Sequence, residues 1–112
     1  MRSLRGAGFA RILHAAEMHT AESGNPVMLL TVEFEQRTLA KGALYAQRVQ
    51  VRSFAAEDHA LVNRLRVGVF VSFDGDCDAI AEKSPTGWWY ANPRVTGRIL
   101  GVYDPDQEVV HG

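Results

Sequence analysis

Hydrophobic and polar residues alternate in two neighbouring segments, residues 27–35 and 45–54, and this alternation limits what the chain can fold into. A period of two is typical of a β-strand that buries one face, because successive side chains of a strand point to opposite sides. Residues 36–44 lie between the two segments and are expected to form a partly basic hairpin loop. The residues predicted to share the buried faces are Met28, Leu30, Val32, Phe34, Val49, Val51 and Ser53.

Residues 55–66 have a different period. Ala56, Ala60, Leu61 and Leu65 recur at helical spacing, with acidic residues near the start and arginines near the end, which suits the dipole of a helix closed by Gly68. Strand patterns lie on both sides of this helix. They predict strands over residues 8–18, 27–35, 45–54, 69–79 and 88–103, with a turn at 19–25 and a loop at 80–87.

The resulting order is three strands, one helix and two strands. This is the plan of the OB-fold, an all-β class built on a small five-stranded barrel. A chain of 112 residues suffices for one domain. We therefore predict a single OB-fold domain over 1–112, with its core at about 8–103 and a short tail at 104–112. Pro93 requires the last strand to be bulged or at an edge at that point.

The composition limits the compartment and the partners. The formal net charge is −1, so an anion-binding surface has to come from the local arrangement of charges. Ten of the twelve basic residues are arginine, which stacks on planar groups and forms paired hydrogen bonds to phosphate.

A single cysteine, Cys77, excludes an internal disulfide and is expected to be a small core residue. No segment has the ~20 apolar residues of a membrane span, and the chain is predicted to be cytoplasmic.

Three short segments resemble bacterial single-stranded DNA-binding proteins. They are SGNPV (23–27) before the second strand, RVQVRSF (48–54) in the third strand and LRVGVFVSFDG (65–75) leading into the fourth strand. The resemblance runs from about Gly8 to Leu100, and PriB-type primosomal proteins share the same fold. It implies non-catalytic binding of single-stranded DNA, with RNA left open, in an accessory role in replication, recombination or repair. It also implies self-association as a dimer or a tetramer.

The resemblance implies that bases stack on exposed aromatic side chains while cations follow the backbone. Phe54 stands where the family has a stacking aromatic residue, whereas Arg48 stands where tryptophan is usual. Trp88 and Trp89 follow the loop between strands 4 and 5, and since neighbours in a strand point to opposite faces, at least one of them is expected to face solvent. The residues predicted to bind nucleic acid are Arg37, Lys41, Tyr45, Arg48, Arg52, Phe54, Trp88, Trp89, Tyr90 and Arg94.

Other interpretations stay open at this stage. Trp88 or Trp89 could cover the barrel or a subunit interface, and the whole domain could be a protein-interaction module that binds no nucleic acid. Glu33 and Glu35 would oppose phosphate if they share the groove. Residues 104–112 lack the glycine- and proline-rich linker and the terminal phenylalanine of the family's recruitment tail, so no acidic-tip tail is predicted.

No cofactor, metal site or catalytic group is predicted. Asp74, Asp76 and Asp78 resemble the start of a calcium loop, but Ala79 and Pro85 occupy the places where such a loop needs glycine and glutamate. These aspartates are expected to line a solvated strand face. The histidines and the cysteine lack metal-ligand spacing, and no nucleophile motif or phosphate-binding glycine loop is present.

Overall fold

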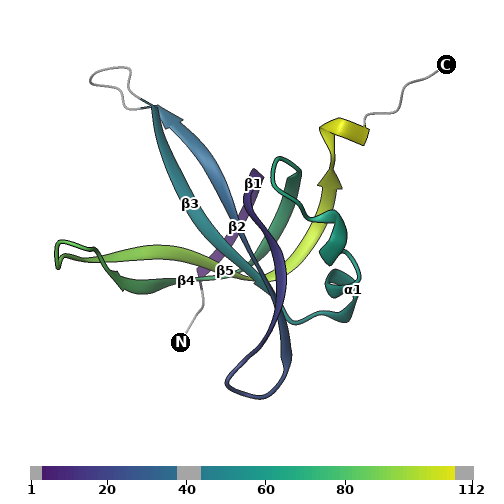
Figure 1. The fold of residues 1–112 in the computed structure, drawn as a ribbon, viewed down its shortest axis with the longest axis horizontal. Coiled ribbons are helices and arrows are strands. Elements are labelled where there is room, and N and C mark those ends of the chain that lie inside the picture. Colours follow the sequence, from purple (N-terminus) through teal and green to yellow (C-terminus); the bar gives the residue numbers. More distant parts are fainter. Residues whose placement is uncertain (1–3, 38–43, 108–112) are drawn as a thin grey trace.

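A computed structural model describes residues 4–37 and 44–107 of the chain. Five strands form a closed barrel in the order β1-β2-β3-β5-β4, and a short helix lies between β3 and β4 (Figure 1). This confirms the predicted all-β class and OB-fold. The elements are β1 (Leu4–Thr20), β2 (Pro26–Arg37), β3 (Leu44–Ser53), α1 (Ala56–His59), η1 (Val62–Arg64), β4 (Phe70–Lys83), β5 (Trp89–Tyr103) and η2 (Pro105–Gln107).

The long strand β1 belongs to both sides of the barrel. Its first half, from Leu4 to Arg11, pairs with β4, and its second half, from Arg11 to Thr20, pairs with β2. Irregularities in the register on either side of His14 let the strand bend between the two sheets. The barrel closes where Gln50–Arg52 of β3 pair in parallel with Arg94–Thr96 of β5.

The interior of the barrel is the face that the alternation predicts. Successive inward residues of β2 and β3 are buried, while Phe34 is partly buried against the same cluster, as is Cys77. Gly75 and Gly97 lie where β4 and β5 come closest, and a Cβ atom on Gly97 would lie 1.9 Å from the carbonyl oxygen of Asp74. Only glycine fits such an approach. The core consists of Ala10, Ile12, Met28, Leu30, Val32, Val49, Val51, Leu65, Val69, Val71, Phe73, Val95 and Ile99.

The helical segment is shorter than predicted. The sequence predicts a helix over 55–66, whereas α1 has four residues and is followed by the 3₁₀ turn η1. Neither helix has a side-chain cap at its start, and a short uncapped segment gains too little to offset the cost of helix nucleation. Packing of Leu65 into the barrel, with Leu61 and Val62 beside it, holds the segment instead.

The predicted loop at 80–87 is also corrected. β4 continues to Lys83 and pairs with β5 as far as Trp89, so the two strands project from the barrel as a hairpin (Figure 1). We call residues 78–94 the β4–β5 arm. From Trp89 to Pro93, β5 pairs with β4 alone, because its pairing with β3 begins at Arg94. Pro93 therefore stands at an edge, as predicted.

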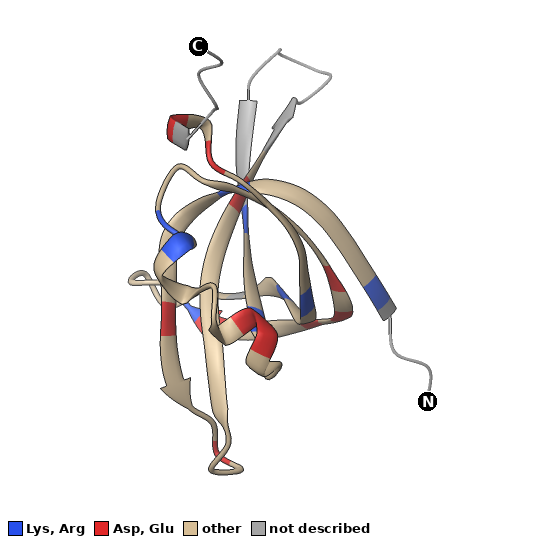
Figure 2. Ribbon diagram, turned by 90° about the vertical axis from the view of Figure 1, so that its right-hand side faces the viewer, with Lys and Arg blue, Asp and Glu red and all other residues tan. Residues whose placement is uncertain are grey.

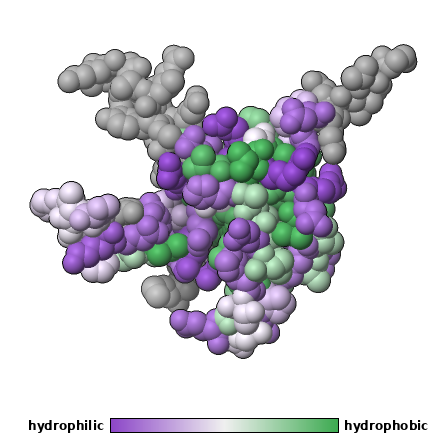
Figure 3. All heavy atoms as spheres, viewed as in Figure 1, coloured by the Kyte–Doolittle hydropathy of each residue, from purple (hydrophilic) through white to green (hydrophobic). Residues whose placement is uncertain are grey.

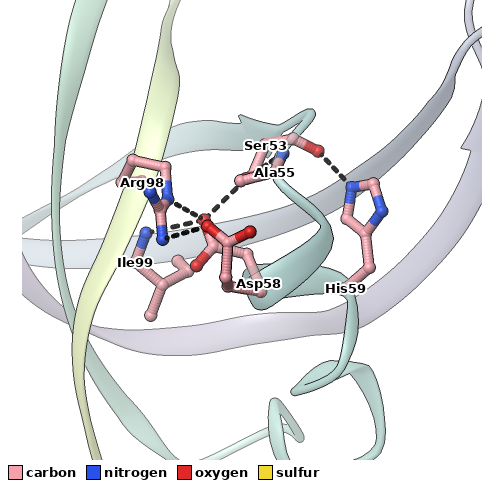
Figure 4. Close-up of polar contacts among 7 residues, drawn as sticks. Ser53, Ala55, Asp58, His59, Arg98 and Ile99 are labelled. Atoms are coloured by element: carbon pink, nitrogen blue, oxygen red, sulfur yellow. Dashed lines mark hydrogen bonds and ion pairs between the residues drawn. The ribbon is translucent and has the colours of Figure 1, made fainter.

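A buried carboxylate fastens α1 to the barrel (Figure 4). Asp58 is 2% exposed, and its Oδ2 accepts hydrogen bonds from Ser53 Oγ at 2.6 Å, Arg98 Nε at 3.1 Å and the backbone N–H of Ile99 at 3.1 Å. The hydrogen bond to Asp58 raises the pKa of Arg98 above its ordinary value. His59 Nε2 lies 2.8 Å from the carbonyl oxygen of Ser53. The end of β3, α1 and the middle of β5 thus meet at one carboxylate.

Replacing Asp58 should strongly destabilise the protein. Asp58→Ala leaves Ser53, Arg98 and a buried backbone N–H without their acceptor, and we expect the free energy of unfolding in urea to fall by about 2–4 kcal/mol. The matched control is Glu57→Gln on the same helix, because Glu57 reaches the same Arg98 at 3.2 Å from the exposed side. Figure 2 shows acidic residues, in red, on the short helix beside the barrel. The control should change the stability by less than about 0.5 kcal/mol. Equal losses for the two variants would contradict the role assigned to Asp58.

Candidate nucleic-acid interface

A groove runs over the outer face of β1, β2 and β3 beside the β4–β5 arm. It consists of two adjoining cavities of about 330 Å³ and 240 Å³ that share His14, Thr31 and Gln50. The larger lies over β1 and β2, and the smaller is closed on one side by the arm. We call the two together the barrel groove. It is lined by His14, Ala15, Glu17, His19, Leu29, Leu30, Thr31, Arg48, Gln50, Ile80, Glu82 and Asn92.

The outward residues of β3 lie at this surface because their neighbours Val49 and Val51 point into the core. Arg48 is exposed, and its Nε lies 3.9 Å from a carboxylate oxygen of Glu33. Arg52 is held more firmly, since its Nε donates a 2.6 Å hydrogen bond to Thr96 Oγ1. Its guanidinium carbon lies 5.6 Å from the ring centroid of Phe54, which is an exposed aromatic residue at the end of β3.

Glu33 does not present an unbalanced charge to the groove. Its carboxylate lies between two arginines, with Arg11 Nη2 at 3.5 Å and Arg48 Nε at 3.9 Å. The side chain of Glu33 is mostly buried, whereas the arginines are exposed. The pair of cations therefore covers this carboxylate, which reduces the opposition to phosphate expected from Glu33. The side chain of Glu35 lies outside the described part of the structure.

The tip of the arm exposes both tryptophans. Trp88 is 77% exposed and Trp89 is 68% exposed, so the prediction that at least one faces solvent is confirmed. Neither of them covers the barrel. Trp88 belongs to the turn rather than to β5, and Lys83 Nζ lies 5.9 Å from the ring centroid of Trp89.

Hydrogen bonds to Ser84 fix the turn that carries Trp88. The backbone N–H of Ser84 donates to the carbonyl of Trp88 at 2.7 Å, and the N–H of Trp88 donates to Ser84 Oγ at 3.0 Å. Gly87 has a φ of +92°, a conformation that favours glycine. Trp88 is therefore presented by an ordered turn, and Trp89 follows it at the first position of β5.

Arg94 is committed to an ion pair at the root of the arm. Its Nε and Nη2 bind both carboxylate oxygens of Asp78, the Nε at 2.9 Å. This hydrogen bonding lowers the pKa of Asp78 and raises that of Arg94. The other two aspartates of the segment, Asp74 and Asp76, pair with Arg5. Arg94 thus joins β4 to β5, and its charge is balanced by Asp78.

Several predicted site residues lie outside the described part of the structure. Lys41 lies in the segment that is not described. Arg37, Tyr45 and Tyr90 have a described backbone in β2, β3 and β5, but their side chains are not described. Among the described residues, no group of three or more His, Cys, Asp or Glu is placed to hold a metal ion. The longest described helix has four residues, and none is long and apolar enough to cross a membrane.

A second surface was not predicted from the sequence. Phe9, Phe70 and Tyr103 form an aromatic row on the outside of the sheet of β1, β4 and β5, with ring centroids 5.5 Å and 6.4 Å apart. Phe9 is 59% exposed, and the nearby Leu100 is exposed too. We call Phe9, Phe70, Leu100 and Tyr103 the aromatic face. In Figure 3 hydrophobic side chains gather over the body of the barrel, while the outer part of the arm is mostly hydrophilic or neutral in colour.

Comparison with known proteins shows the fold. No protein-family model and no curated protein matches the sequence. Among solved structures, a small single-stranded DNA-binding protein from Streptomyces coelicolor matches with a TM-score of 0.68 and 12% identity, over 96% of this chain and 99% of that one. A Plasmodium falciparum SSB in complex with ssDNA matches with a TM-score of 0.64 and 11% identity, over 86% of this chain and 88% of that one. At these identities the likeness is one of fold: the chain has the same barrel fold as these two structures.

The ion pair at the root of the arm should contribute stability that depends on pH. Because Arg94 lowers the pKa of Asp78 below its ordinary value of 3.8, the contribution is present at neutral pH and is lost as the pH falls through the lowered pKa. Half of the Asp78 side chain is exposed, so the contribution is at most about 1 kcal/mol. We expect Asp78→Asn to be less stable than the wild type at pH 7 and equally stable near pH 2, as measured by urea unfolding. Glu22→Gln, in the exposed β1–β2 turn, is the control, and a difference for Asp78→Asn that persists at low pH would contradict the pairing.

Proposed function

We propose that this chain is a non-catalytic single-stranded DNA-binding protein that uses the barrel groove and the tip of the β4–β5 arm. The observation that carries the proposal is the exposure of Trp88 and Trp89, on and directly after an ordered turn at the end of the arm that borders the groove. The two solved structures of the same fold are a single-stranded DNA-binding protein and an SSB in complex with ssDNA, and they support this use of the barrel.

Exposed indoles are suited to binding single strands. Each indole offers a flat surface on which any base can stack, and stacking contributes about 1–3 kcal/mol per base without selecting a sequence. Two exposed tryptophans are unfavourable in water unless a partner covers them. Phe54, with Arg52 against its ring, offers a further aromatic surface at the end of β3. Bases would stack on Trp88, Trp89 and Phe54, with Tyr45 and Tyr90 as further candidates on the same two strands.

Phosphate contacts would come from the cations that surround these aromatic residues. Arg48 is the exposed arginine of the groove, Arg52 lies beside Phe54, and Lys83 lies beside Trp89. Arg37 and Lys41 are further proposed phosphate contacts, and their side chains lie outside the described part of the structure. Arg94 contributes mainly by holding the arm, since Asp78 balances its charge. The role is an accessory one in replication, recombination or repair in the cytoplasm, and PriB-type primosomal DNA binding is the alternative role.

Titration with oligo-dT tests the stacking directly. We expect the tryptophan fluorescence to be quenched on binding, and Trp88→Ala or Trp89→Ala to raise Kd about 5- to 150-fold, which corresponds to one lost base stack.

Arg48→Ala should reduce the slope of log K against log salt by about 0.7, the value for one phosphate contact on a single strand. Val67→Ala, which removes an exposed hydrophobic residue outside the groove and the arm, is the control.

Two results would contradict the proposal. Unchanged fluorescence with no binding at low salt would remove the DNA-binding function. It would favour the alternative, an OB-fold module that binds another protein through its exposed aromatic residues. Binding that leaves the emission of both tryptophans unchanged would retain the function but remove the stacking role of the arm.

The aromatic face supports self-association as part of the proposal. Among the described residues, the first half of β1 pairs with β4 alone, so its other edge is open beside the exposed Phe9. An open strand edge next to an exposed hydrophobic face is the combination that pairs with a second copy of the same chain. A dimer or a tetramer would bury Phe9, Phe70, Leu100 and Tyr103.

Substitution of Phe9 tests this assembly. We expect light scattering to show a dimer or a tetramer for the wild type and a shift toward the monomer for Phe9→Glu, because a buried charge opposes the interface. Val67→Glu adds the same charge at another exposed hydrophobic position and should keep the wild-type mass. A monomeric wild type at concentrations of tens of micromolar would contradict self-association.

A further inference from the structure

We propose that His14 is an additional phosphate-binding residue that acts only in its protonated form, so that single-strand binding strengthens as the pH falls through the range in which histidine titrates. This inference rests on the proposed function and concerns the regulation of the same groove. It comes from the position of His14 among the charges that line the groove.

His14 lies at the centre of the barrel groove. It lines both cavities, together with Thr31 and Gln50. The register places these three residues in one row across the barrel, because His14 pairs with Thr31 on β2, and Thr31 pairs with Gln50 on β3. The row continues to Arg94 on β5, which Asp78 balances. His14 is therefore the ionisable residue of this row whose charge can change near neutral pH.

The irregular register of β1 explains how His14 reaches this position. The pairing of β1 with β2 shifts on both sides of His14, between Ile12 and His14 and again between His14 and Glu17. Such bulges turn a side chain away from the direction that simple alternation would give it. Ile12 is fully buried, while His14 is exposed at the groove. The bend that lets β1 serve two sheets thus also presents the imidazole to the groove.

The charges around His14 are finely balanced. The charged groups that line the groove with His14 are Glu17 and His19 from β1, Arg48 from β3 and Glu82 from the arm. Arg11 and Glu33 line another cavity, where they pair with each other, and Arg52 donates a hydrogen bond to Thr96. With neutral histidines, one arginine faces two glutamates along the groove, and the formal charge of this lining is −1. Protonation of His14 and His19 changes it to +1. A groove that is slightly unfavourable for phosphate therefore becomes favourable for it over the pH range of histidine titration.

The two histidines have different parts in this change. His19 Nε2 lies 3.4 Å from a carboxylate oxygen of Glu17, so a protonated His19 neutralises that acid. His14 has Thr31 and Gln50 beside it, neutral side chains that leave its imidazolium able to meet a phosphate. We therefore assign the direct contact to His14 and a smaller, indirect effect to His19.

The test is the affinity for oligo-dT between pH 8.0 and pH 5.5 at constant ionic strength, with the fold checked by circular dichroism at each pH. We expect wild-type Kd to fall about five- to ten-fold over this range, the effect of one charge-assisted contact. His14→Gln should lose most of this change. His14→Lys, which carries a permanent charge, should bind at pH 8.0 about as tightly as the wild type binds at pH 5.5.

The control and the contrary results separate this inference from the proposed function. His59→Gln removes a histidine outside the groove and should keep the dependence on pH. A wild type that binds oligo-dT with the same Kd at all pH values would overturn the role of His14 and leave the DNA-binding function intact. So would a His14→Gln variant that keeps the full change. A wild type that binds at no pH would instead remove the function itself.

Discussion

The buried carboxylate of Asp58 joins the parts of the chain that close the barrel. It accepts hydrogen bonds from the end of β3 and from two groups of β5, while its own helix lies between β3 and β4. Beside this point β3 and β5 pair over only three residues on each strand, the one parallel contact of the described barrel. A parallel pairing this short gains little from its own hydrogen bonds. The Asp58 contacts, together with the hydrogen bond from Arg52 to Thr96, therefore reinforce the closure, and the closure fixes the outer face of β3.

The candidate site combines a rigid face with a projecting arm. Arg48, Gln50 and Arg52 are fixed in direction because the residues between them are buried in the core. The arm leaves the barrel at the Asp78–Arg94 pair and ends in the turn that carries Trp88. This arrangement separates two tasks. The barrel supplies positioned charges and hydrogen-bonding groups, and the arm supplies flat aromatic surfaces.

Part of this structure could be predicted from the sequence, and the rest depends on tertiary contacts. The alternation at 28–34 and 49–53 identified the buried faces of β2 and β3, and the adjacent tryptophans indicated an exposed aromatic residue. Residues 80–83 lack alternation because both faces of the arm meet solvent, so the length of the arm was missed. The position of His14 depends on two register shifts, and the pairing of Arg94 with Asp78 depends on cross-strand register. Neither can be read from a single sequence.

The most direct test of this account is amide hydrogen exchange with and without saturating oligo-dT. Bound DNA should slow exchange in residues 48–53 of β3, in Phe54 and in the arm at 78–94, and it should leave the aromatic face around Phe9 and Tyr103 unchanged. That pattern would place the strand across the barrel groove and onto the tip of the arm. Protection confined to the first half of β1 and to residues 100–103, with an unchanged arm, would contradict the central claim and place the DNA on the aromatic face.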